Sequence, residues 1–314
     1  MKTITPHLWF DKEAKEAVDF YVSAFPRSRV THRSTLSGVP TPSGDCDIVA
    51  FELSGQPFMA INAGPVFKPN PSISFFVNFD PSREKDAPKR LDTLWKKLSE
   101  GGKALMPLDK YPFSERYGWA QDRFGFSWQL ILSDPKGEPR PDIAPSLLFT
   151  GDVAGRAEEA VDYYVSVFEG RRGITARYGK EHAPDKEGTL MFADFALNGQ
   201  WFAAMDSAHP HGFGFNEAVS LLIPCESQQE IDALTPKLSA VPEAEQCGWT
   251  KDRFGVSWQM HSVALDELLT KGAPEQIQTV TQAFLGMKRL DIAALQKAHE
   301  GAKSAATGGG RKRA

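Results

Sequence analysis

The strongest constraint on the fold is that one sequence pattern occurs twice in this chain of 314 residues. The segment EAVDFYVSAF, which begins at Glu16, recurs from Glu159 as EAVDYYVSVF with eight of ten positions identical. A second segment, GWAQDRFGFSWQ from Gly118, recurs from Gly248 as GWTKDRFGVSWQ, and the order of the two segments is preserved. A repeat of this length predicts two copies of one folded module.

The copies set the expected domain organisation. We expect a first module over residues 1–136, a second over 137–265, and a C-terminal extension over 266–314. The joint, SDPKGEPRP at 133–141, holds three prolines and a glycine, which disfavour both a helix and a central strand and therefore predict a linker. Two modules of this size match the usual size of single domains.

Each module has the same predicted order of elements. A short strand at 4–10 precedes a helix in which Ala14, Val18 and Tyr21 recur at helical spacing. A hairpin follows, and in the second copy it turns at Asn198-Gly199, a dipeptide typical of tight turns. A further strand, a helix and a closing strand complete each module, which predicts a mixed α+β fold.

Three segments of the first module carry a family resemblance. TPHLWFDKEAKEAVDFYVSAF, ELSGQPFMAINAG and DRFGFSWQL resemble the PhnB-like branch of the glyoxalase/bleomycin-resistance/dioxygenase superfamily, also called the vicinal oxygen chelate superfamily. The resemblance covers 4–132 and 143–261. It implies an α+β fold of tandem glyoxalase-like modules, each made of paired βαβββ units whose curved mixed sheets form a ligand-holding cup.

Members of this branch are often labelled 3-demethylubiquinone 3-methyltransferase. A classical methyltransferase binds S-adenosylmethionine on a glycine-rich turn between a buried strand and a helix. The candidate run Gly170-Arg171-Arg172-Gly173 is too short and wrongly placed for this turn. Methyltransferase activity is therefore not expected.

The resemblance also implies where a metal would bind, because metal-using members take ligands from the first strand, from the first strand of the second unit and from a Glu on the last strand. The corresponding residues are, in the first module, His7, Ser74 or its neighbour Ser72, and Gln129, and in the second module Ser146, Ser220 and Gln259. Hydroxyls and neutral amides are weak ligands for divalent cations. We expect no metal in the second module, whereas His7 with Gln129 leaves a divalent metal possible in the first.

The same residues are candidate ligand contacts. Gln129 and Gln259 lie in apolar strands, where a buried amide needs hydrogen-bond partners, so each either orients a ligand or ties the sheet together. Trp9, Trp119 and Trp249 are candidates for flat apolar contacts. The full predicted ligand-binding set is His7, Trp9, Ser74, Trp119, Gln129, Ser146, Ser220, Trp249 and Gln259.

Three other groups invite chemical interpretations. Glu52 alternates with the apolar residues of its strand and could face the cup of the first module as a general base, and is the candidate catalytic residue. Asp122-Arg123 precedes a tight turn, which favours a structural role. His209-Pro210-His211 lies on a glycine-rich segment, where an exposed loop is favoured over a metal clip.

The composition limits the binding partners and the cellular location expected for this protein. The net charge of −4 comes from 40 acidic and 36 basic residues spread along the chain, so nucleic acid is not an expected partner. No apolar run reaches the roughly 18 residues needed to cross a bilayer, and no signal peptide is evident, so we expect a cytoplasmic protein that does not bind membranes. Its three cysteines are expected to be reduced.

The extension predicts one or two amphipathic helices within 277–298 and a mobile tail over 303–313. Taken together, the sequence favours a cytosolic small-molecule-binding protein without cofactor or metal. The alternative is a metal-dependent isomerase, lyase or dioxygenase acting from the first module, so enzymatic activity stays open. The chain is expected to be either a monomer with an internal pseudo-dimer or a homodimer, and its second module could serve architecture alone.

Overall fold

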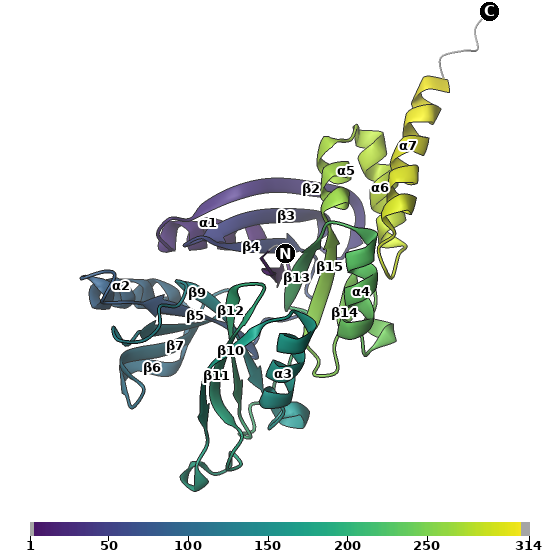
Figure 1. Ribbon diagram of the computed structural model, residues 1–314. Helices are drawn as coiled ribbons and strands as arrows, with labels where there is room; N and C mark the ends of the chain where they lie inside the picture. Colours follow the sequence, from purple (N-terminus) through teal and green to yellow (C-terminus); the bar gives the residue numbers. More distant parts are fainter. Residues whose placement is uncertain (1–2, 309–314) are drawn as a thin grey trace, which may run out of the picture.

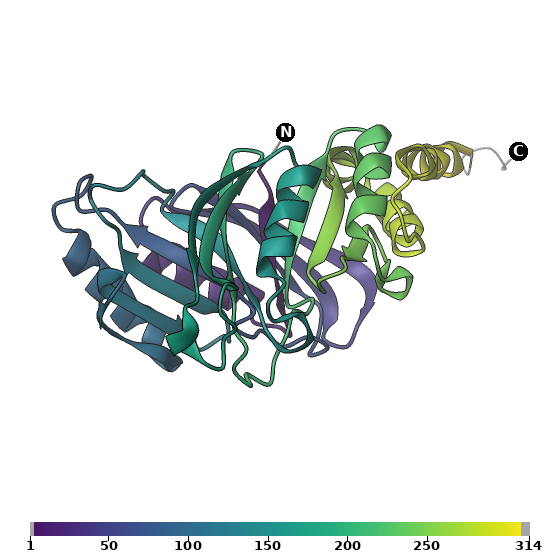
Figure 2. The same cartoon turned by 60° about the horizontal axis from the view of Figure 1, so that its bottom comes forward.

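The computed structural model describes residues 3–308, and it contains two large curved mixed sheets with helices packed on their outer faces (Figure 1). The view in Figure 2 shows the sheets beside each other, with the C-terminal helices at one end of the molecule. The α+β class predicted from the sequence is confirmed. Of the tail predicted over 303–313, residues 309–313 lie outside the described residues, whereas 303–308 form the end of a helix instead of a mobile segment.

The first module contributes eight strands and two helices. They are β1 (Thr5–Phe10), α1 (Ala14–Ala24), β2 (Arg29–Thr41), β3 (Gly44–Leu53), β4 (Gln56–Asn62), β5 (Ile73–Phe79), α2 (Ala87–Ser99), β6 (Lys103–Tyr111), β7 (Ser114–Gln121) and β8 (Ser127–Leu132). The order β, α, βββ therefore occurs twice within this module, as the family resemblance implies.

The second module repeats this order with one strand fewer. Its elements are β9 (Ile143–Phe149), α3 (Ala157–Val167), β10 (Arg171–Arg177), β11 (Leu190–Leu197), β12 (Gln200–Asp206), β13 (Val219–Cys225), α4 (Gln228–Leu238), β14 (Trp249–Lys251) and β15 (Ser257–Ser262). Three short 3-10 helices, η1 (Gly151–Val153), η2 (Lys180–His182) and η3 (Pro242–Ala244), lie in its connections. The counterpart of β6 is replaced by the turn of η3.

Each sheet combines strands from both modules. The seven-stranded sheet has the order β14-β15-β13-β1-β4-β3-β2, and the eight-stranded sheet has the order β10-β11-β12-β9-β5-β8-β7-β6. The junctions are antiparallel: His7 on β1 lies opposite Ser220 on β13, and Ser74 on β5 lies opposite Ser146 on β9. The expectation of one cup per module is thus corrected, because the first unit of each module pairs with the second unit of the other.

The outer faces of the sheets are apolar and are covered by helices. Helix α1 buries Ala14, Ala17, Val18 and Tyr21 against β3 and β4. The Tyr21 hydroxyl donates to the buried carboxylate of Asp122 over 2.7 Å. The same carboxylate accepts from the indole of Trp128 and from two backbone amides of the following turn.

The second module repeats this arrangement. Asp252 accepts from Tyr164 over 2.6 Å and from the indole of Trp258 over 2.8 Å. Burial raises the pKa of both Asp122 and Asp252. The structure therefore gives these aspartates a packing role on the outer face of the sheets.

The C-terminal extension forms three helices, α5 (Val263–Lys271), α6 (Pro274–Leu285) and α7 (Ile292–Gly308). The backbone amides of Cys247 and Gly248 donate to the carbonyls of Met287 and Lys288, at 2.7 and 2.9 Å. The segment between α6 and α7 thus covers the backbone next to β14, where the missing strand would have continued the sheet. Helix α6 also contacts β2 at the other edge of the seven-stranded sheet.

Candidate functional site

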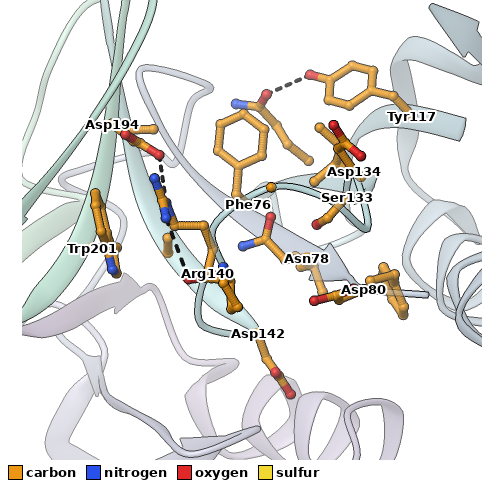
Figure 3. Close-up of a pocket in the computed structure, with 18 of the residues that line it drawn as sticks. Phe76, Asn78, Asp80, Tyr117, Ser133, Asp134, Arg140, Asp142, Asp194 and Trp201 are labelled. Carbon is orange, nitrogen blue, oxygen red and sulfur yellow. Dashed lines mark hydrogen bonds and ion pairs between the residues drawn. The ribbon is translucent and has the colours of Figure 1, made fainter. Parts of the chain in front are cut away.

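The inner face of the eight-stranded sheet encloses a cavity of about 680 Å³ (Figure 3). Strand alternation decides which residues reach it, because successive side chains of a strand point to opposite faces. On β5, Phe75 packs in the outer core, whereas Phe76 and Asn78 line the cavity. The apolar part of the wall is a cluster around Phe76, Tyr117, Ala144, Phe192, Trp201, Ala203 and Met205.

A short hydrogen-bonded chain supplies polar groups within this wall. The Tyr117 hydroxyl donates to Gln129 Oε1 over 2.6 Å, and Gln129 Nε2 donates to Ser74 Oγ over 2.8 Å. A carboxamide has two acceptor sites and two N–H donors, so one of each remains on Gln129. Burial raises the pKa of Tyr117, which keeps the phenol neutral. The Gln129 side chain can therefore both donate a hydrogen bond to a ligand and accept one from it.

Two further polar groups lie on this face without a protein partner. Ser146, opposite Ser74, is fully buried, and its hydroxyl makes no hydrogen bond among the described residues. The indole N–H of Trp119, which lies opposite Gln129 on β7, is also buried and unbonded. A buried polar group without a partner is costly, and a bound molecule is one way of satisfying it.

The linker between the modules closes one side of the cavity. Its Arg140 is only 14% exposed and donates from Nε to Asp194 over 2.7 Å. The Arg140 guanidinium carbon lies 3.8 Å from the ring centroid of Trp201, which is a cation–π arrangement. The linker predicted from its prolines and glycine is therefore also part of the cavity wall.

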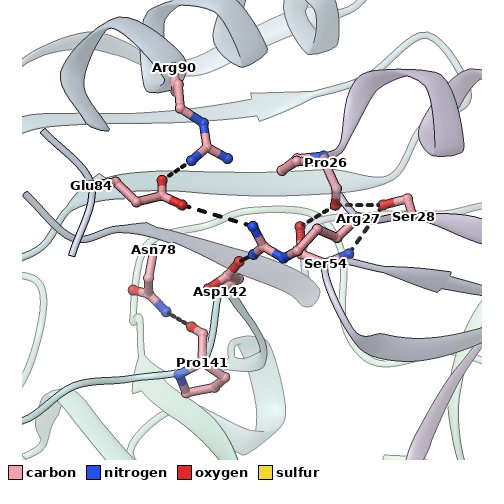
Figure 4. A network of polar contacts seen from close by, with 9 residues as sticks. All are labelled: Pro26, Arg27, Ser28, Ser54, Asn78, Glu84, Arg90, Pro141 and Asp142. Atoms are coloured by element: carbon pink, nitrogen blue, oxygen red, sulfur yellow. Dashed lines mark hydrogen bonds and ion pairs between the residues drawn. The ribbon is translucent and has the colours of Figure 1, made fainter. Parts of the chain in front are cut away.

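A polar network holds the rim at the junction of the units (Figure 4). Arg27, just after α1, forms an ion pair with Asp142 and lies 3.9 Å from Glu84, which is also paired with Arg90. The Asn78 side chain donates to the carbonyl of Pro141 over 2.7 Å. The contacts of Arg27 with Asp142 and of Asn78 with Pro141 fix the end of the linker against α1 and β5, because they join segments distant in the sequence.

The inner face of the seven-stranded sheet carries the equivalent residues. Gln259 Nε2 donates to Ser220 Oγ over 2.8 Å, which repeats the Gln129–Ser74 pair. His7 packs edge-on against Trp249 with ring centroids 5.7 Å apart. Trp9 contacts Trp249 and donates its indole N–H to the carbonyl of Gly64 over 2.7 Å.

His7 is the one imidazole among these matched positions. It is buried, and its Nδ1 has no hydrogen-bond partner among the described residues. Burial, with a smaller contribution from His261, lowers the pKa of His7 to about 3. The side chain is therefore neutral at physiological pH.

The structure regroups the candidate residues that the sequence suggested. His7, Ser220 and Gln259 lie together on the seven-stranded sheet, and Ser146, Ser74 and Gln129 lie together on the other. The sequence left open a divalent metal held by His7 with Gln129, but the structure places these two residues on different sheets. Each inner face therefore combines residues of both modules, because the sheets cross between modules.

Neither group of donors suits a divalent cation. The eight-stranded sheet offers two hydroxyls and an amide already bonded at both ends, and the seven-stranded sheet offers one imidazole with an amide and a hydroxyl that bond each other. Divalent cations in proteins favour carboxylates, thiolates and several imidazoles. Within residues 3–308, no cluster of three or more His, Cys, Asp or Glu side chains has a metal-binding arrangement.

Glu52, the candidate general base, lies near the end of β3. It forms a 3.0 Å ion pair with Arg29 on the neighbouring strand. His7 lies opposite Met59, and Met59 lies opposite Ala50, so Glu52 is two strands away from His7 and two residues further along. The ion pair with Arg29 already engages the Glu52 carboxylate. A catalytic role for Glu52 stays a prediction.

The two histidines of the His209-Pro210-His211 segment find separate partners. His209 lies 3.5 Å from the carboxylate of Asp185, and His211 Nε2 lies 2.7 Å from the hydroxyl of Ser207. Asp185 comes from a distant loop that local sequence spacing does not indicate. Both contacts stabilise the loop after β12.

Sequence reasoning missed Arg140, Asp194 and Trp201. The alternation of β12 could have identified Trp201, because it faces away from the core residue Phe202. Arg140 and Asp194 carry no comparable signal, since their pairing depends on the linker crossing the second module's sheet.

The chain resembles known proteins in two parts of its sequence. The family described as 3-demethylubiquinone-9 3-methyltransferase matches residues 2–131 and again 141–261. No curated protein matches the chain significantly. The resemblance to the PhnB-like branch inferred from the three sequence segments is therefore confirmed.

Several solved structures are similar to parts of this chain. The PhnB protein from Bacillus cereus is 35% identical over 42% of this chain and 100% of its own, with a TM-score of 0.38. A protein from Pseudomonas aeruginosa is 22% identical over 42% of this chain and 98% of its own, with a TM-score of 0.35. Glyoxalase I from Zea mays is 13% identical over 75% of this chain and 79% of its own, with a TM-score of 0.46.

A search of the described helices found none that combines the length and the apolar character needed to span a membrane.

Proposed function

The chain belongs to the family described as 3-demethylubiquinone-9 3-methyltransferase, as two tandem copies, and on this premise we propose that it binds a small organic molecule on the inner face of the eight-stranded sheet. The observation that carries the proposal is the cavity of about 680 Å³, which has aromatic and aliphatic walls with few polar groups among them. Small-molecule sites are typically concave, mostly apolar and roughly 300–1,000 Å³ in volume.

The polar groups of the cavity favour a neutral ligand with a group that both donates and accepts hydrogen bonds. Gln129 retains one acceptor site and one N–H beyond its bonds to Tyr117 and Ser74. Four arginines and six acidic residues line the cavity, and several of them neutralise one another. The cavity therefore has no excess positive charge that would favour binding of an anionic ligand.

We propose that binding requires no metal. The groups around Gln129 are neutral, the Gln129 amide is held in place by protein hydrogen bonds, and the carboxylate of Asp194 is paired with Arg140. The alternative function, a metal-dependent isomerase, lyase or dioxygenase, relied on His7 and Gln129 acting together. These two residues lie on different sheets, which favours the metal-free proposal over this alternative.

The methyltransferase activity in the family's name is not part of the proposal. S-adenosylmethionine sites of the classical kind use a glycine-rich turn from a parallel strand into a helix. Within the described residues, Gly170-Arg171-Arg172-Gly173 instead lies where the chain leaves α3 and enters the edge strand β10. The backbone there leads from a helix into a strand, which reverses the required order.

The proposal is tested with a matched pair of variants, Gln129→Leu and Gln259→Leu. Each removes one buried Gln–Ser hydrogen bond, but only Gln129 lines the cavity. We expect a thermal-shift screen of neutral aromatic fragments to give hits whose affinity falls about tenfold in Gln129→Leu, because a lost hydrogen bond in a buried site costs roughly 1–3 kcal/mol. Gln259→Leu should leave the affinities within about twofold.

Two results would contradict the proposal. One is a screen in which no fragment stabilises the wild-type protein, since any ligand of the folded state raises its apparent stability. The other is a set of hits weakened by Gln259→Leu and unaffected by Gln129→Leu, which would move the site to the seven-stranded sheet.

A further inference from the structure

The rim of the cavity exposes an unusual concentration of apolar side chains. Among the described residues the exposed large apolar side chains are Phe113 and Val66, each 61% exposed, Ile174 at 57% and Met191 at 37%. Phe113, Ile174 and Met191 line the cavity, whereas Val66 does not. Exposed apolar side chains are common singly, but their collection around one opening indicates a binding surface.

These three side chains come from opposite ends of the sheet. Phe113 lies at the tip of the hairpin joining β6 to β7, and Ile174 lies on β10. Strands β6 and β10 are the two edges of the eight-stranded sheet. The sheet therefore curls until both edges border one cavity, and the three side chains flank the opening between them.

Aromatic contacts connect Phe113 at the rim to the polar groups inside. Phe113 contacts Tyr111 and Tyr117, with ring centroids 5.6 and 5.0 Å apart. Tyr117 in turn donates its hydroxyl to Gln129. On the other side of the cavity, Phe192 contacts Phe76, with ring centroids 5.8 Å apart, and both residues line the cavity. A ligand reaching Gln129 would leave the cavity along an apolar surface.

We infer that the ligand is a neutral amphiphile, with a hydrogen-bonding head at Gln129 and Tyr117 and an apolar tail that extends outward over Phe113, Ile174 and Met191. This inference rests on the proposed function and specifies the class of its ligand. The tail explains why these side chains stay exposed, because it would cover them in the complex. Continuity with the cavity favours a ligand tail over a separate protein partner.

The test uses a series of 4-alkylphenols, from 4-ethylphenol through 4-butylphenol and 4-hexylphenol to 4-octylphenol, with affinities from isothermal titration calorimetry. The phenol group can donate and accept at Gln129, and the alkyl chain lengthens towards the rim. We expect the affinity of the wild-type protein to increase about two- to fourfold for each methylene, as burial of a methylene group predicts.

The triple variant Phe113→Ser, Ile174→Ser, Met191→Ser should bind 4-ethylphenol within about twofold of wild type, yet lose most of the gain from longer chains. Val66→Ser is the matched control, since it removes an equally exposed apolar side chain away from the cavity, and it should retain the full dependence on chain length. Circular dichroism of each variant confirms that it is folded.

The outcomes separate the two proposals. If 4-ethylphenol binding depends on Gln129 but affinity does not change along the series, the inference that an apolar ligand tail covers the rim is refuted. The proposed ligand site at Gln129 is then retained. If no alkylphenol binds, the site and the tail both fail. Sedimentation showing that the wild-type chain dimerises and the triple variant does not would overturn the inference in favour of an interface between copies.

Discussion

At the scale of single residues, the two inner faces differ although their sequences are copies. Both carry a Gln–Ser pair, but only Gln129 also accepts from a tyrosine hydroxyl. The repeat aligns Tyr117 with Cys247, whose backbone instead bonds to the segment after α6. His7 occupies the position of Ser146. These two differences place the hydrogen-bonding chain of the proposed site on one sheet and a lone buried imidazole on the other.

His7 should make the folded state sensitive to acid. Its pKa is lowered from 6.5 to about 3 by burial and by His261, so the unfolded chain binds a proton at His7 in the window between these values and the folded chain does not. Stability linked to His7 is therefore present above pH 6.5 and is lost as the pH falls towards 3. At pH 5 this loss amounts to about 2 kcal/mol.

The variant His7→Leu should remove this sensitivity. The unfolding free energy is measured by urea unfolding at pH 7.5 and at pH 5.0. Its decrease between these two pH values should be about 2 kcal/mol smaller in His7→Leu than in the wild type. At pH 7.5 the variant should be no less stable, because Nδ1 has no hydrogen bond to lose. His32→Leu, which alters an exposed histidine on β2, is the control and should keep the wild-type difference. An unchanged pH dependence in His7→Leu would refute this account.

At the scale of elements, the hairpins were the most predictable part of the chain. Asn198 and Gly199 have φ angles of 50° and 78°, as the predicted tight turn requires, and the turn at Ser54-Gly55 in the first copy has 48° and 87°. Positive φ at both central residues matches the right-handed twist of the flanking strands. This local chemistry is readable in the sequence because it involves only neighbouring residues.

Gly199→Ala should destabilise the protein by about 1–2 kcal/mol, since a side chain is disfavoured at positive φ. A Cβ atom at Gly199 would meet no atom within 4 Å, so the expected loss comes from the backbone alone. Gly214 is equally open but lacks a positive φ, and Gly214→Ala should change the unfolding free energy by less than about 0.5 kcal/mol. Equal effects of both substitutions in urea unfolding would contradict the turn assignment.

The missing strand of the second module was only partly visible in the sequence. The offset between the copies falls from 143 at Glu16 to 130 at Gly118, so the second copy is 13 residues shorter between these points. The shortening indicates a lost element without showing what replaces it. The structure shows η3 and the segment between α6 and α7 beside β14, a contact between regions about 40 residues apart.

At the scale of the whole molecule, the sequence predicted the units correctly but not their pairing. Strand β5 offers an edge that β1 or β9 could fill equally well, because β1 and β9 are copies of each other. A repeat is symmetric, and nothing in composition or periodicity distinguishes pairing within a module from pairing across modules. Each candidate ligand position was predicted from local strand alternation, whereas the grouping of these positions on two inner faces depends on the topology.

Pairing across modules predicts how the chain responds to a cut in its linker. A protease site inserted between Lys136 and Gly137 lies in an exposed turn, and cleavage there leaves fragments 1–136 and 137–314. These fragments share both sheets, through β1 with β13 and β5 with β9. The cleaved protein should therefore elute from size exclusion as one particle of full-length size and unfold in urea in one transition. Were each module closed on itself, the fragments would separate without denaturant, and that result would refute the crossed topology.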